Sequence, residues 1–382
     1  MKICVITAAR SEYGLLRGLI FELRARKNVE LSVLATGSHL EKSYGYTVRE
    51  IEGDGVDIAA RVHICAGDTK FGVLDTMANA LSKVGRAVSK IKPDIAVILG
   101  DRYESLSIAA ACCALGVPIA HIHGGELTYG AFDDAFRHAI TKMASLHFAA
   151  CAQYRKRIIQ LGENPKTVFD VGALGVENIR KIPLLSKREI ERVAGVVEAS
   201  KTFLATFHPI TTETDSQEAQ MRALLDALVG RGGYTSLFTY PNADTGSRRL
   251  NALLSRYAKK YPDKIKVVGS LGARNYLSMM KYCAAVVGNS SSGIIEAPSF
   301  KRATVNVGSR QDGRVRTPSI IDCKPDAASI SRALDTALNA DFAEVLAKVK
   351  SPYGGKPTAK LIADKLLSET PKLGGKKIFF DL

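Results

Sequence analysis

The chain has 382 residues, too many for one small hydrophobic core, so two domains are expected. Its apolar content of 46% and charged content of 24% are typical of a soluble globular protein, and no apolar run is long enough to cross a membrane. The formal net charge of +15 is spread along the chain, without a dense basic run or interleaved aromatic residues. An anionic small substrate explains this charge as well as nucleic acid does, so nucleic-acid binding remains a minor alternative.

The cysteines indicate the compartment. There are seven, mostly in apolar segments, and none forms a Cys-x-x-Cys pair. Reduced thiols in a cytoplasm are therefore expected, with neither a disulfide framework nor a zinc site. The apolar run at residues 3–7 is too short for a signal peptide and lacks a cleavage site, so it is expected to be the first strand.

The first half of the chain alternates short apolar runs with segments of helical periodicity. Strands are expected at residues 3–7, 31–35, 59–64, 94–99, 119–122, 147–150 and 168–171. Helices are expected after the first strand and at residues 71–89, 105–115, 135–144 and 152–161. This alternation predicts a parallel, doubly wound α/β domain over residues 1–175.

A second alternation follows a linker with one helix at residues 173–200. Strands are expected at residues 203–207, 236–239, 265–268, 284–287 and 304–307. Helices are expected at residues 216–228, 248–261, 275–282, 326–339 and 357–368. The second domain is therefore placed at residues 185–356, and two Rossmann-like halves facing a cleft are predicted, with the site in that cleft.

The stretch GNSSSGIIE at residues 288–296 has the pattern of a phosphate-binding loop. An apolar strand precedes it and a short helix is expected to follow, so free N–H groups and the hydroxyls of Ser290, Ser291 and Ser292 can face an anion. Gly293 lets the backbone approach closely. Glu296, expected one turn into the helix, can accept hydrogen bonds from a ribose. The alternative is an ordinary serine-rich helix cap.

Ionisable residues also follow two strands of the first half, at the sheet edge where open α/β sheets bind ligands. Asp101 and Arg102 follow the strand at 94–99, and Glu126 follows the strand at 119–122. Strand alternation directs His121 and His123, in the same segment as Glu126, to one side. A helix cap explains Asp101 equally simply, and the spacing around the histidines matches no familiar zinc pattern.

The pair Asp133-Asp134 precedes a predicted helix and can be simply the negative charge at its N-terminus. Together with Asp101 and the His/Glu loop, it forms a set suited to acid/base chemistry.

Four further residues, one histidine and three arginines, are candidates because of their position after a strand. His208 ends the first strand of the second half, and a lone histidine there is as often structural as functional. Arg10 and Arg314, with Arg310 beside the latter, can clamp a diphosphate or a sugar. The alternative for each arginine is an ordinary solvated surface residue.

Eight segments together resemble the hydrolysing UDP-N-acetylglucosamine 2-epimerases of bacterial sialic acid synthesis, and the related enzymes acting on a 2,4-diacetamido sugar for legionaminic acid. They are ARSEYG at 9–14, LGDRYE at 99–104, HIHGGE at 121–126, DAFRHAITKM at 134–143, FHP at 207–209, NADTGS at 242–247, GNSSSG at 288–293 and GSRQDGR at 308–314. The resemblance runs in order from residue 1 to about residue 365. It implies a glycosyltransferase-B fold and a homodimer, with a last helix at about 357–370 packing back on the first domain.

The resemblance also implies a two-step reaction. A base removes the C2 proton while UDP leaves C1, giving a glycal, and water then adds to release the free 2-epimer. Such an elimination needs a positioned base, charge stabilisation at the diphosphate and a closed site. No redox cofactor or metal is implied.

Three roles follow from matching positions. Asp101 and Asp133 match carboxylates assigned to proton transfer. The family's third carboxylate is often found where this chain has His123, with Glu126 three residues on, which leaves open which of the two takes that role. His208 matches a histidine near the phosphates of the nucleotide.

The UDP-sugar is the expected partner. The expected contacts to it are Arg10, Ser11, Arg102, Asn242, Ser290, Ser291, Ser292, Gly293, Glu296 and Arg314. The sequence leaves open whether the sugar is N-acetylglucosamine or its 2,4-diacetamido analogue. Two rivals also remain open: a glycosyltransferase of the same fold, and a binding protein for UDP-sugars or nucleic acid.

Overall fold

The computed structural model describes residues 1–382 except 68, 130–131, 210–216, 241–246 and 375. The chain groups into two compact units. Unit 1 comprises Met1–Glu126, Asp133–Asn178 and Gly355–Leu382, and unit 2 comprises Leu127–Phe132 and Ile179–Gly354. Within the described residues, none of the helices combines the length and apolar character needed to cross a bilayer.

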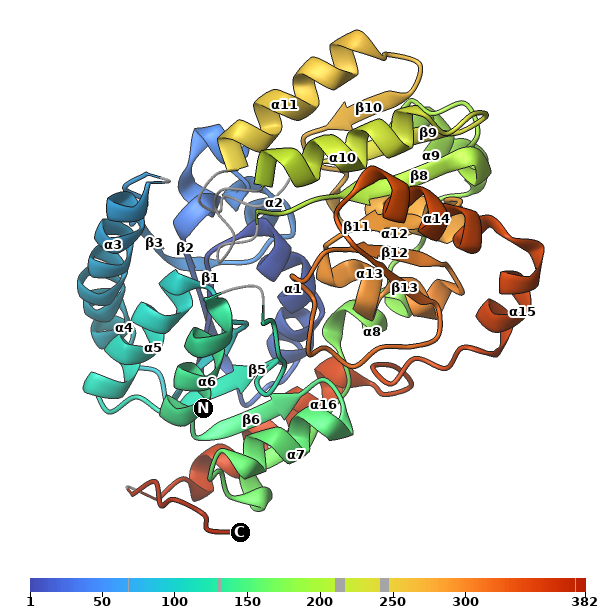
Figure 1. Ribbon diagram of the computed structural model, residues 1–382. Coiled ribbons are helices and arrows are strands. Elements are labelled where there is room, and N and C mark those ends of the chain that lie inside the picture. The colour runs from blue at the N-terminus through green and yellow to red at the C-terminus, as the bar shows by residue number, and fades with distance from the viewer. Residues whose placement is uncertain (68, 130–131, 210–216, 241–246, 375) are drawn as a thin grey trace. The chain divides into compact units, whose positions relative to one another are not determined.

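The described part of unit 1 contains a seven-stranded parallel sheet in the order β3-β2-β1-β4-β5-β6-β7. Its strands are β1 (Lys2–Thr7), β2 (Glu30–Thr36), β3 (Ile58–Val62), β4 (Ile95–Leu99), β5 (Ile119–Ile122), β6 (Leu146–Ala149) and β7 (Val168–Asp170). Its helices are α1 (Arg10–Arg24), α2 (Val48–Gly53), α3 (Lys70–Asn79), α4 (Gly85–Ile91), α5 (Tyr103–Ala114), α6 (Asp133–Met143), α7 (Ala152–Gln160) and α16 (Thr358–Glu369). The helices cover both faces of the sheet (Figure 1).

Both faces of this sheet are apolar because helices cover both. In β1, Ile3 and Val5 belong to a core that includes residues of α1 and α16. The intervening Cys4 and Ile6 belong to a second core with residues of α4 and α5. Continuous apolar strands of this kind are typical of parallel sheets, and they explain why the apolar runs in the sequence located the strands.

The described part of unit 2 repeats this plan with a six-stranded parallel sheet in the order β10-β9-β8-β11-β12-β13. Its strands are β8 (Thr202–Thr206), β9 (Thr235–Thr239), β10 (Ile265–Val268), β11 (Val286–Gly288), β12 (Thr304–Val307) and β13 (Ile320–Cys323). Its helices are α9 (Lys187–Ala194), α10 (Gln217–Val229), α11 (Ser247–Lys260), α12 (Gly272–Tyr282), α13 (Ser291–Ile295), α14 (Ala327–Leu338) and α15 (Ala340–Lys348). The prediction of two parallel, doubly wound α/β sheets is confirmed.

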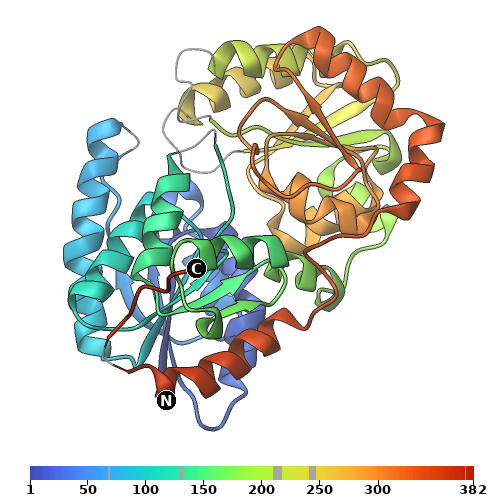
Figure 2. The same ribbon diagram turned by 60° about the horizontal axis from the view of Figure 1, so that its bottom comes forward.

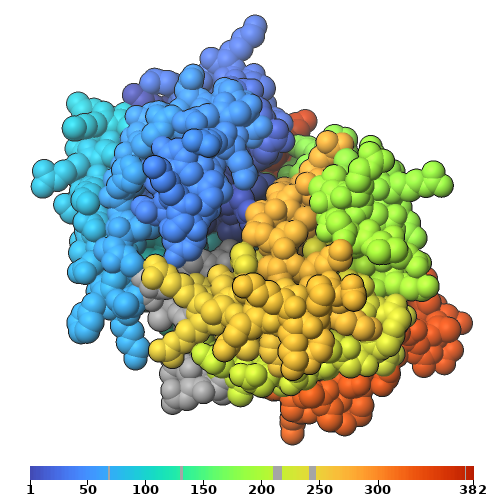
Figure 3. Space-filling view, turned by 90° about the horizontal axis from the view of Figure 1, so that it is seen from above, coloured from blue at the N-terminus to red at the C-terminus, as the bar shows by residue number. Residues whose placement is uncertain are grey.

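Local sequence explains how individual helices begin and end. Helix α9 begins with a capping box, in which the Ser186 and Glu189 side chains each accept the other residue's N–H. It ends at Gly195, whose φ of 66° suits glycine. Helix α11 buries Leu250 and Leu253 and presents its polar side on the outer surface of unit 2, seen in yellow in Figure 3.

Several elements differ from the predictions. The helix expected at residues 71–89 is one continuous helical segment, in which α3 passes through a π-helical turn at Ala80–Val84 into α4. Two helices, α8 (Leu174–Lys181) and α9, lie where one was expected at residues 173–200, and helices α2 and α15 and strand β13 had not been predicted. Strand β13 is short and half exposed, so it lacks the continuous apolar run that located the other strands.

The last helix belongs to the first unit. Ile362 and Leu366 of α16 join the same core as Leu16 and Leu19 of α1. The Thr358 hydroxyl donates to the Val171 carbonyl at 2.9 Å, which fixes the start of the helix. Figure 2 shows this red segment lying along unit 1, where both chain termini also lie.

Candidate active site

Both sheets reverse their strand order beside their first strand, which is where doubly wound sheets bind ligands. In unit 1, β1 lies between β2 and β4; in unit 2, β8 lies between β9 and β11. Arg10 follows β1 and Asp101 follows β4 at the carboxyl ends of the strands. His208 follows β8 and Asn289 follows β11 at the equivalent point of unit 2. Each unit therefore carries sequence-predicted residues at its own switch point.

Arg137, on α6, is the centre of the polar cluster in unit 1. Its side chain is 1% exposed, so its charge needs partners inside the protein. The guanidinium contacts the Asp101 carboxylate and donates to Asp134 Oδ1 and to the Glu126 carbonyl, both at 2.9 Å. One arginine thus joins the end of β4, the loop after β5 and the first turn of α6.

The predicted Asp133 is the first residue of α6 and is half-buried. Its neighbour Asp134 binds Arg137 and lies 3.5 Å from His138 Nε2. Both aspartates are therefore candidates for proton transfer, and Arg137 joins Asp134 to Asp101.

His123 and Glu126 are brought together. His123 Nδ1 lies 3.3 Å from Glu126 Oε1, and both residues are buried, with 8% and 3% of their surface exposed. Strand β5 ends at Ile122, and His123 has a φ of 68°, a left-handed conformation that is uncommon for histidine. The strand alternation expected to pair His121 with His123 therefore stops one residue before His123.

His121 has a structural role in supporting α6. It is fully buried, and burial lowers its pKa to about 3 despite the hydrogen bond with the Gly100 carbonyl, so its imidazole is neutral. A carbonyl can only accept, so Nε2 donates to Gly100 at 2.8 Å and Nδ1 accepts from the Thr141 hydroxyl at 3.1 Å. His121 thus ties the last turn of α6 to Gly100, the residue before Asp101.

Buried carboxylates orient the loops that carry the expected UDP contacts in unit 1. Glu104 accepts the Arg102 Nε–H at 2.6 Å, and Glu12 accepts the Ala8 N–H at 2.7 Å. Burial, and next the charge of Glu104, raises the pKa of Glu12 to about 7. The sequence reasoning had not singled out either glutamate; a carboxylate three positions into a helix is the pattern that points to Glu12.

Arg10 and Ser11 open helix α1. Ser11 is exposed, whereas Arg10 is half-buried. Burial lowers the pKa of Arg10, and the charge of Glu50 opposes that shift. Arg10 therefore carries a partly desolvated charge beside the first strand, where it is able to bind an anion.

In unit 2, Asn289 and His208 lock together. Asn289 is fully buried; its Oδ1 accepts the His208 N–H at 2.6 Å, and its Nδ2 donates to the His208 carbonyl at 2.9 Å. The preceding Gly288 has a φ of 125°, and a Cβ there would overlap the Thr206 carbonyl. Only glycine lets β11 pass this close to β8. The Gly-Ser loop thus fixes the position of the predicted histidine.

The serines begin the short helix α13, as expected. Ser290 is its N-cap, and the Ser290 hydroxyl accepts the Ser292 N–H at 3.4 Å. Gly293 is buried, and a side chain there would meet Thr304. Glu296 had been expected inside this helix, but it is the residue that directly follows α13.

Tyr276 is a neighbour of this loop that the sequence did not reveal. Burial raises its pKa to about 12, against hydrogen bonds with Ser292 and Thr206, and the charge of Glu296 acts in the same direction as burial. Its phenol therefore lies among the serine loop, the end of β8 and the predicted ribose-binding carboxylate. It comes from α12, whose sequence carries no motif.

The arginine loop after β12 closes over Asn289. Gln311 Nε2 and Arg310 Nη1 donate to the Asn289 carbonyl at 2.7 Å and 3.1 Å. Arg314 lies in the same loop and is half-buried. The loop also contacts the segment after Glu126, because the Tyr129 N–H donates to the Asp312 carbonyl at 3.2 Å. Asn242, the remaining predicted contact, lies outside the described residues.

The comparisons with known proteins show the family of the chain. The chain matches the family model described as UDP-N-acetylglucosamine 2-epimerase over residues 21–367. It is 41% identical over 322 residues to a Campylobacter jejuni protein named GDP/UDP-N,N'-diacetylbacillosamine 2-epimerase (hydrolyzing), covering 84% of each chain. It is 37% identical over 385 residues to the Escherichia coli polysialic acid biosynthesis protein P7, covering 100% of this chain and 97% of that one.

A solved structure gives the same fold. The crystal structure of UDP-GlcNAc 2-epimerase from Neisseria meningitidis bound to UDP-GlcNAc matches with a TM-score of 0.80 at 15% identity. The match covers 96% of this chain and 100% of that one. The predicted glycosyltransferase-B type of fold is therefore confirmed.

Proposed function

This chain belongs to the UDP-N-acetylglucosamine 2-epimerase family, and from that membership we propose that it is a hydrolysing enzyme that converts a UDP-2-acetamido sugar into UDP and the free 2-epimer. The observation that carries the proposal is the cluster at the ends of β4 and β5. There, Asp101, Asp134 and Arg137 are joined, and His123 contacts Glu126. Carboxylates and an imidazole at a switch point are suited to moving protons.

The proposed first step is an anti-elimination. A base takes the C2 proton as the C1–O bond breaks, its electron pair leaves with UDP, and a C1=C2 double bond forms in a 2-acetamidoglucal. In the second step, water adds across the double bond. Hydroxide bonds to C1, and a proton bonds to C2 on the face opposite the one from which the first proton left. The products are UDP and free N-acetylmannosamine, and the C2 proton comes from solvent.

Asp101 and the first turn of α6, Asp133 with Asp134, are assigned the proton transfers. Arg137 holds Asp101 and Asp134 in register. The third proton-transfer position is assigned to His123 and Glu126 acting together. Glu126 contacts Nδ1 and so directs proton exchange to the other ring nitrogen.

Unit 2 is assigned the nucleotide. Ser290, Ser291, Ser292 and Gly293 supply N–H and hydroxyl donors for the diphosphate, with His208 fixed beside them by Asn289. Glu296, near the phenol of Tyr276, is assigned to the ribose hydroxyls. Arg10, Ser11, Arg102, Asn242 and Arg314 complete the proposed contacts.

The first candidate substrate is UDP-N-acetylglucosamine, whose product feeds sialic acid synthesis. The relative at 41% identity favours a second candidate, UDP-N,N'-diacetylbacillosamine, with the same chemistry for legionaminic acid. The two sugars differ most at C4, and a few pocket contacts decide such a choice. A homodimer is expected from the family resemblance.

The test is a proton NMR time course in deuterium oxide, run separately with each nucleotide sugar. We expect free UDP and a 2-epimer that carries deuterium at C2, from at least one of them. Asp101→Asn should abolish this turnover. Transfer of the sugar with C2 configuration and C2 proton retained would instead indicate a glycosyltransferase, and no release of UDP from either sugar would overturn the proposal.

A further inference from the structure

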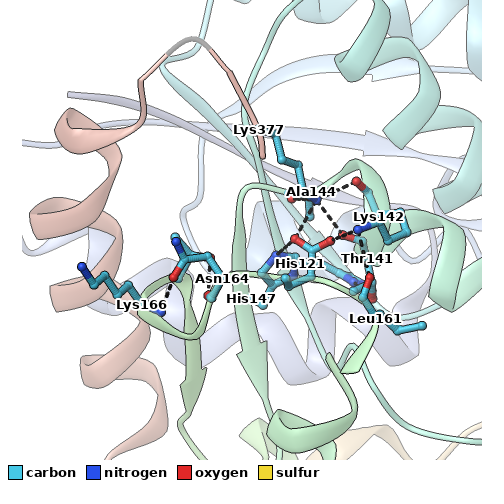
Figure 4. Close-up of polar contacts among 11 residues, drawn as sticks. His121, Thr141, Lys142, Ala144, His147, Leu161, Asn164, Lys166 and Lys377 are labelled. Carbon is cyan, nitrogen blue, oxygen red and sulfur yellow. Dashed lines mark hydrogen bonds and ion pairs between the residues drawn. The ribbon is translucent and has the colours of Figure 1, made fainter. Parts of the chain in front are cut away.

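Glu163, just after α7, is a buried carboxylate that was not among the residues predicted for the site. Only 2% of its side chain is exposed, so its charge needs partners. Lys142 Nζ lies 2.7 Å from Oε1, Lys377 Nζ lies 2.7 Å from Oε2, and His147 Nε2 donates to Oε2 at 2.9 Å. Figure 4 shows Lys142, His147 and Lys377 converging from three segments. Burial acts to raise the pKa of Glu163, but these partners outweigh it and bring the pKa to about 2.

Lys377 also binds the end of α6. Its Nζ donates to the carbonyls of Lys142 and Ala144, both at 2.6 Å, and lies 3.4 Å from the Thr141 carbonyl. The last carbonyls of a helix have no partner within the helix, and a cation is favoured there. Lys377 therefore acts as a C-terminal cap supplied by a segment more than 200 residues later in the sequence.

Aromatic residues fasten the tail that carries Lys377. The Phe380 N–H donates to the Gly162 carbonyl at 2.9 Å. The Phe379 ring lies against Gly162, where any Cβ would overlap it, and Lys142 Nζ lies 4.7 Å from the ring centroid. The tail thus docks on the same turn that carries Glu163, so its contact with α6 is part of a built interface.

The opposite end of α6 carries the proposed proton-transfer cluster. Asp134 and Arg137 lie in its first turns, and Thr141 in its last turn contacts His121. A helix of 11 residues moves as a rod about 16 Å long. A displacement at the end held by Lys377 therefore reaches the contact between Arg137 and Asp101.

We propose that Lys377 is a positioning residue for the elimination step, which it supports by holding the C-terminal end of α6 on Glu163. This inference rests on the proposed function for its catalytic consequence. No contact between Lys377 and the substrate is proposed. Its effect is to keep Asp134 and Arg137 in register with Asp101.

The test compares Lys377→Met, Lys377→Arg and, as the matched control, the exposed neighbour Lys376→Met. For Lys377→Met we expect kcat to fall roughly tenfold with KM within about twofold, because orientation and not binding is lost. The isotope effect with substrate deuterated at C2 should rise. Lys377→Arg should recover most of kcat, and Lys376→Met should match the wild type.

A Lys377→Met protein with wild-type kcat would overturn the proposal. So would a loss of kcat with an unchanged isotope effect and no recovery by arginine, which would indicate general destabilisation. Phe379→Ala loosens the same tail without removing a charge beside Glu163, so it tests the proposal with less risk to folding. It should shift kcat and the isotope effect in the same direction but less strongly.

A second readout does not depend on activity. Amide hydrogen exchange over residues 133–144 should be faster in Lys377→Met than in Lys376→Met, and equal exchange would contradict the clamp. If the wild type turns over neither nucleotide sugar, the proposed function fails while this exchange measurement still decides the role of Lys377.

Discussion

Asn289 contacts both backbone groups of His208, a residue 81 positions earlier, with one hydrogen bond accepted and one donated by the same amide. Asn289→Asp keeps the accepting oxygen and loses the donor. We expect the free energy of unfolding to fall by about 2–4 kcal/mol at neutral pH, because a buried carboxylate then faces a carbonyl. Turnover should fall with it.

The pH dependence of Asn289→Asp distinguishes this cause from a general packing defect. The introduced carboxyl can donate again once it is protonated, so the loss of stability should shrink between pH 8 and pH 5 in denaturant titrations. Asn339→Asp is the control. Asn339 caps α15 by accepting the Asp341 N–H at 2.9 Å, and aspartate performs that role equally well. A pH-independent loss at position 289 would contradict the explanation.

Arg137→Lys tests the arginine that joins three segments. Lysine keeps the charge but lacks the planar fork that reaches Asp101, Asp134 and the Glu126 carbonyl together. We expect kcat to fall by roughly 100-fold in a steady-state assay of UDP release. Arg86→Lys, at an exposed position, should have no effect. Wild-type kcat in Arg137→Lys would show that the cluster does not depend on this fork.

Glu12→Gln tests a buried carboxyl by its effect on stability. The pKa of Glu12 is raised to about 7, from 4.5 in the unfolded chain, so between these values the native state keeps a proton that the unfolded chain has lost. The contribution of this group to stability therefore falls as pH rises through that window. Glutamine does not ionise, so the variant does not lose stability in this way.

The stability of Glu12→Gln relative to the wild type should thus rise between pH 4.5 and pH 7, by up to about 3 kcal/mol. Urea unfolding at a series of pH values measures it. Glu30→Gln, at an exposed position, serves as the reference for removing one negative charge. A difference that stays constant with pH at position 12 would show that the native carboxyl titrates normally.

Gly288→Ala tests the close passage of β11 past β8. The added Cβ would meet the Thr206 carbonyl, and φ of 125° is unfavourable for alanine, so we expect a loss of about 3 kcal/mol or more. Gly269→Ala is the control, since a Cβ there meets nothing within 4 Å. Thermal unfolding of the two variants gives the comparison, and similar melting temperatures would contradict the strain.

The strands most readily predicted from the sequence are the buried ones, which are continuous apolar runs in the middle of a parallel sheet. Strands β1 and β4 are buried on both faces, so their positions follow from composition alone. Strand β13 and helix α15 could not be found this way, because β13 is half exposed and α15 contains no fully buried residue. For such elements, tertiary contacts decide, and a single sequence does not record them.

The residues of the candidate site likewise fall into those that a local sequence pattern predicts and those that depend on contacts distant in sequence. Asp101 and His208 were predicted because they follow strands, and strand ends meet at a known edge of such sheets. The amide pairing of Asn289 with His208 and the burial of Arg137 depend on residues distant in sequence. The contact of Glu163 with Lys377 joins two different chain segments of unit 1, so no local sequence motif reveals it.

The position of α16 sets an order of events during protein synthesis. Residues 355–382 leave the ribosome after residues 179–354, so unit 1 is translated in portions separated by nearly the whole of unit 2. Until then the apolar side of α1 lacks Ile362 and Leu366. Unit 2 begins later on the ribosome, yet its last residue, Gly354, emerges before the last segment of unit 1. Of the two units, the one whose synthesis starts first is therefore the one that finishes folding last.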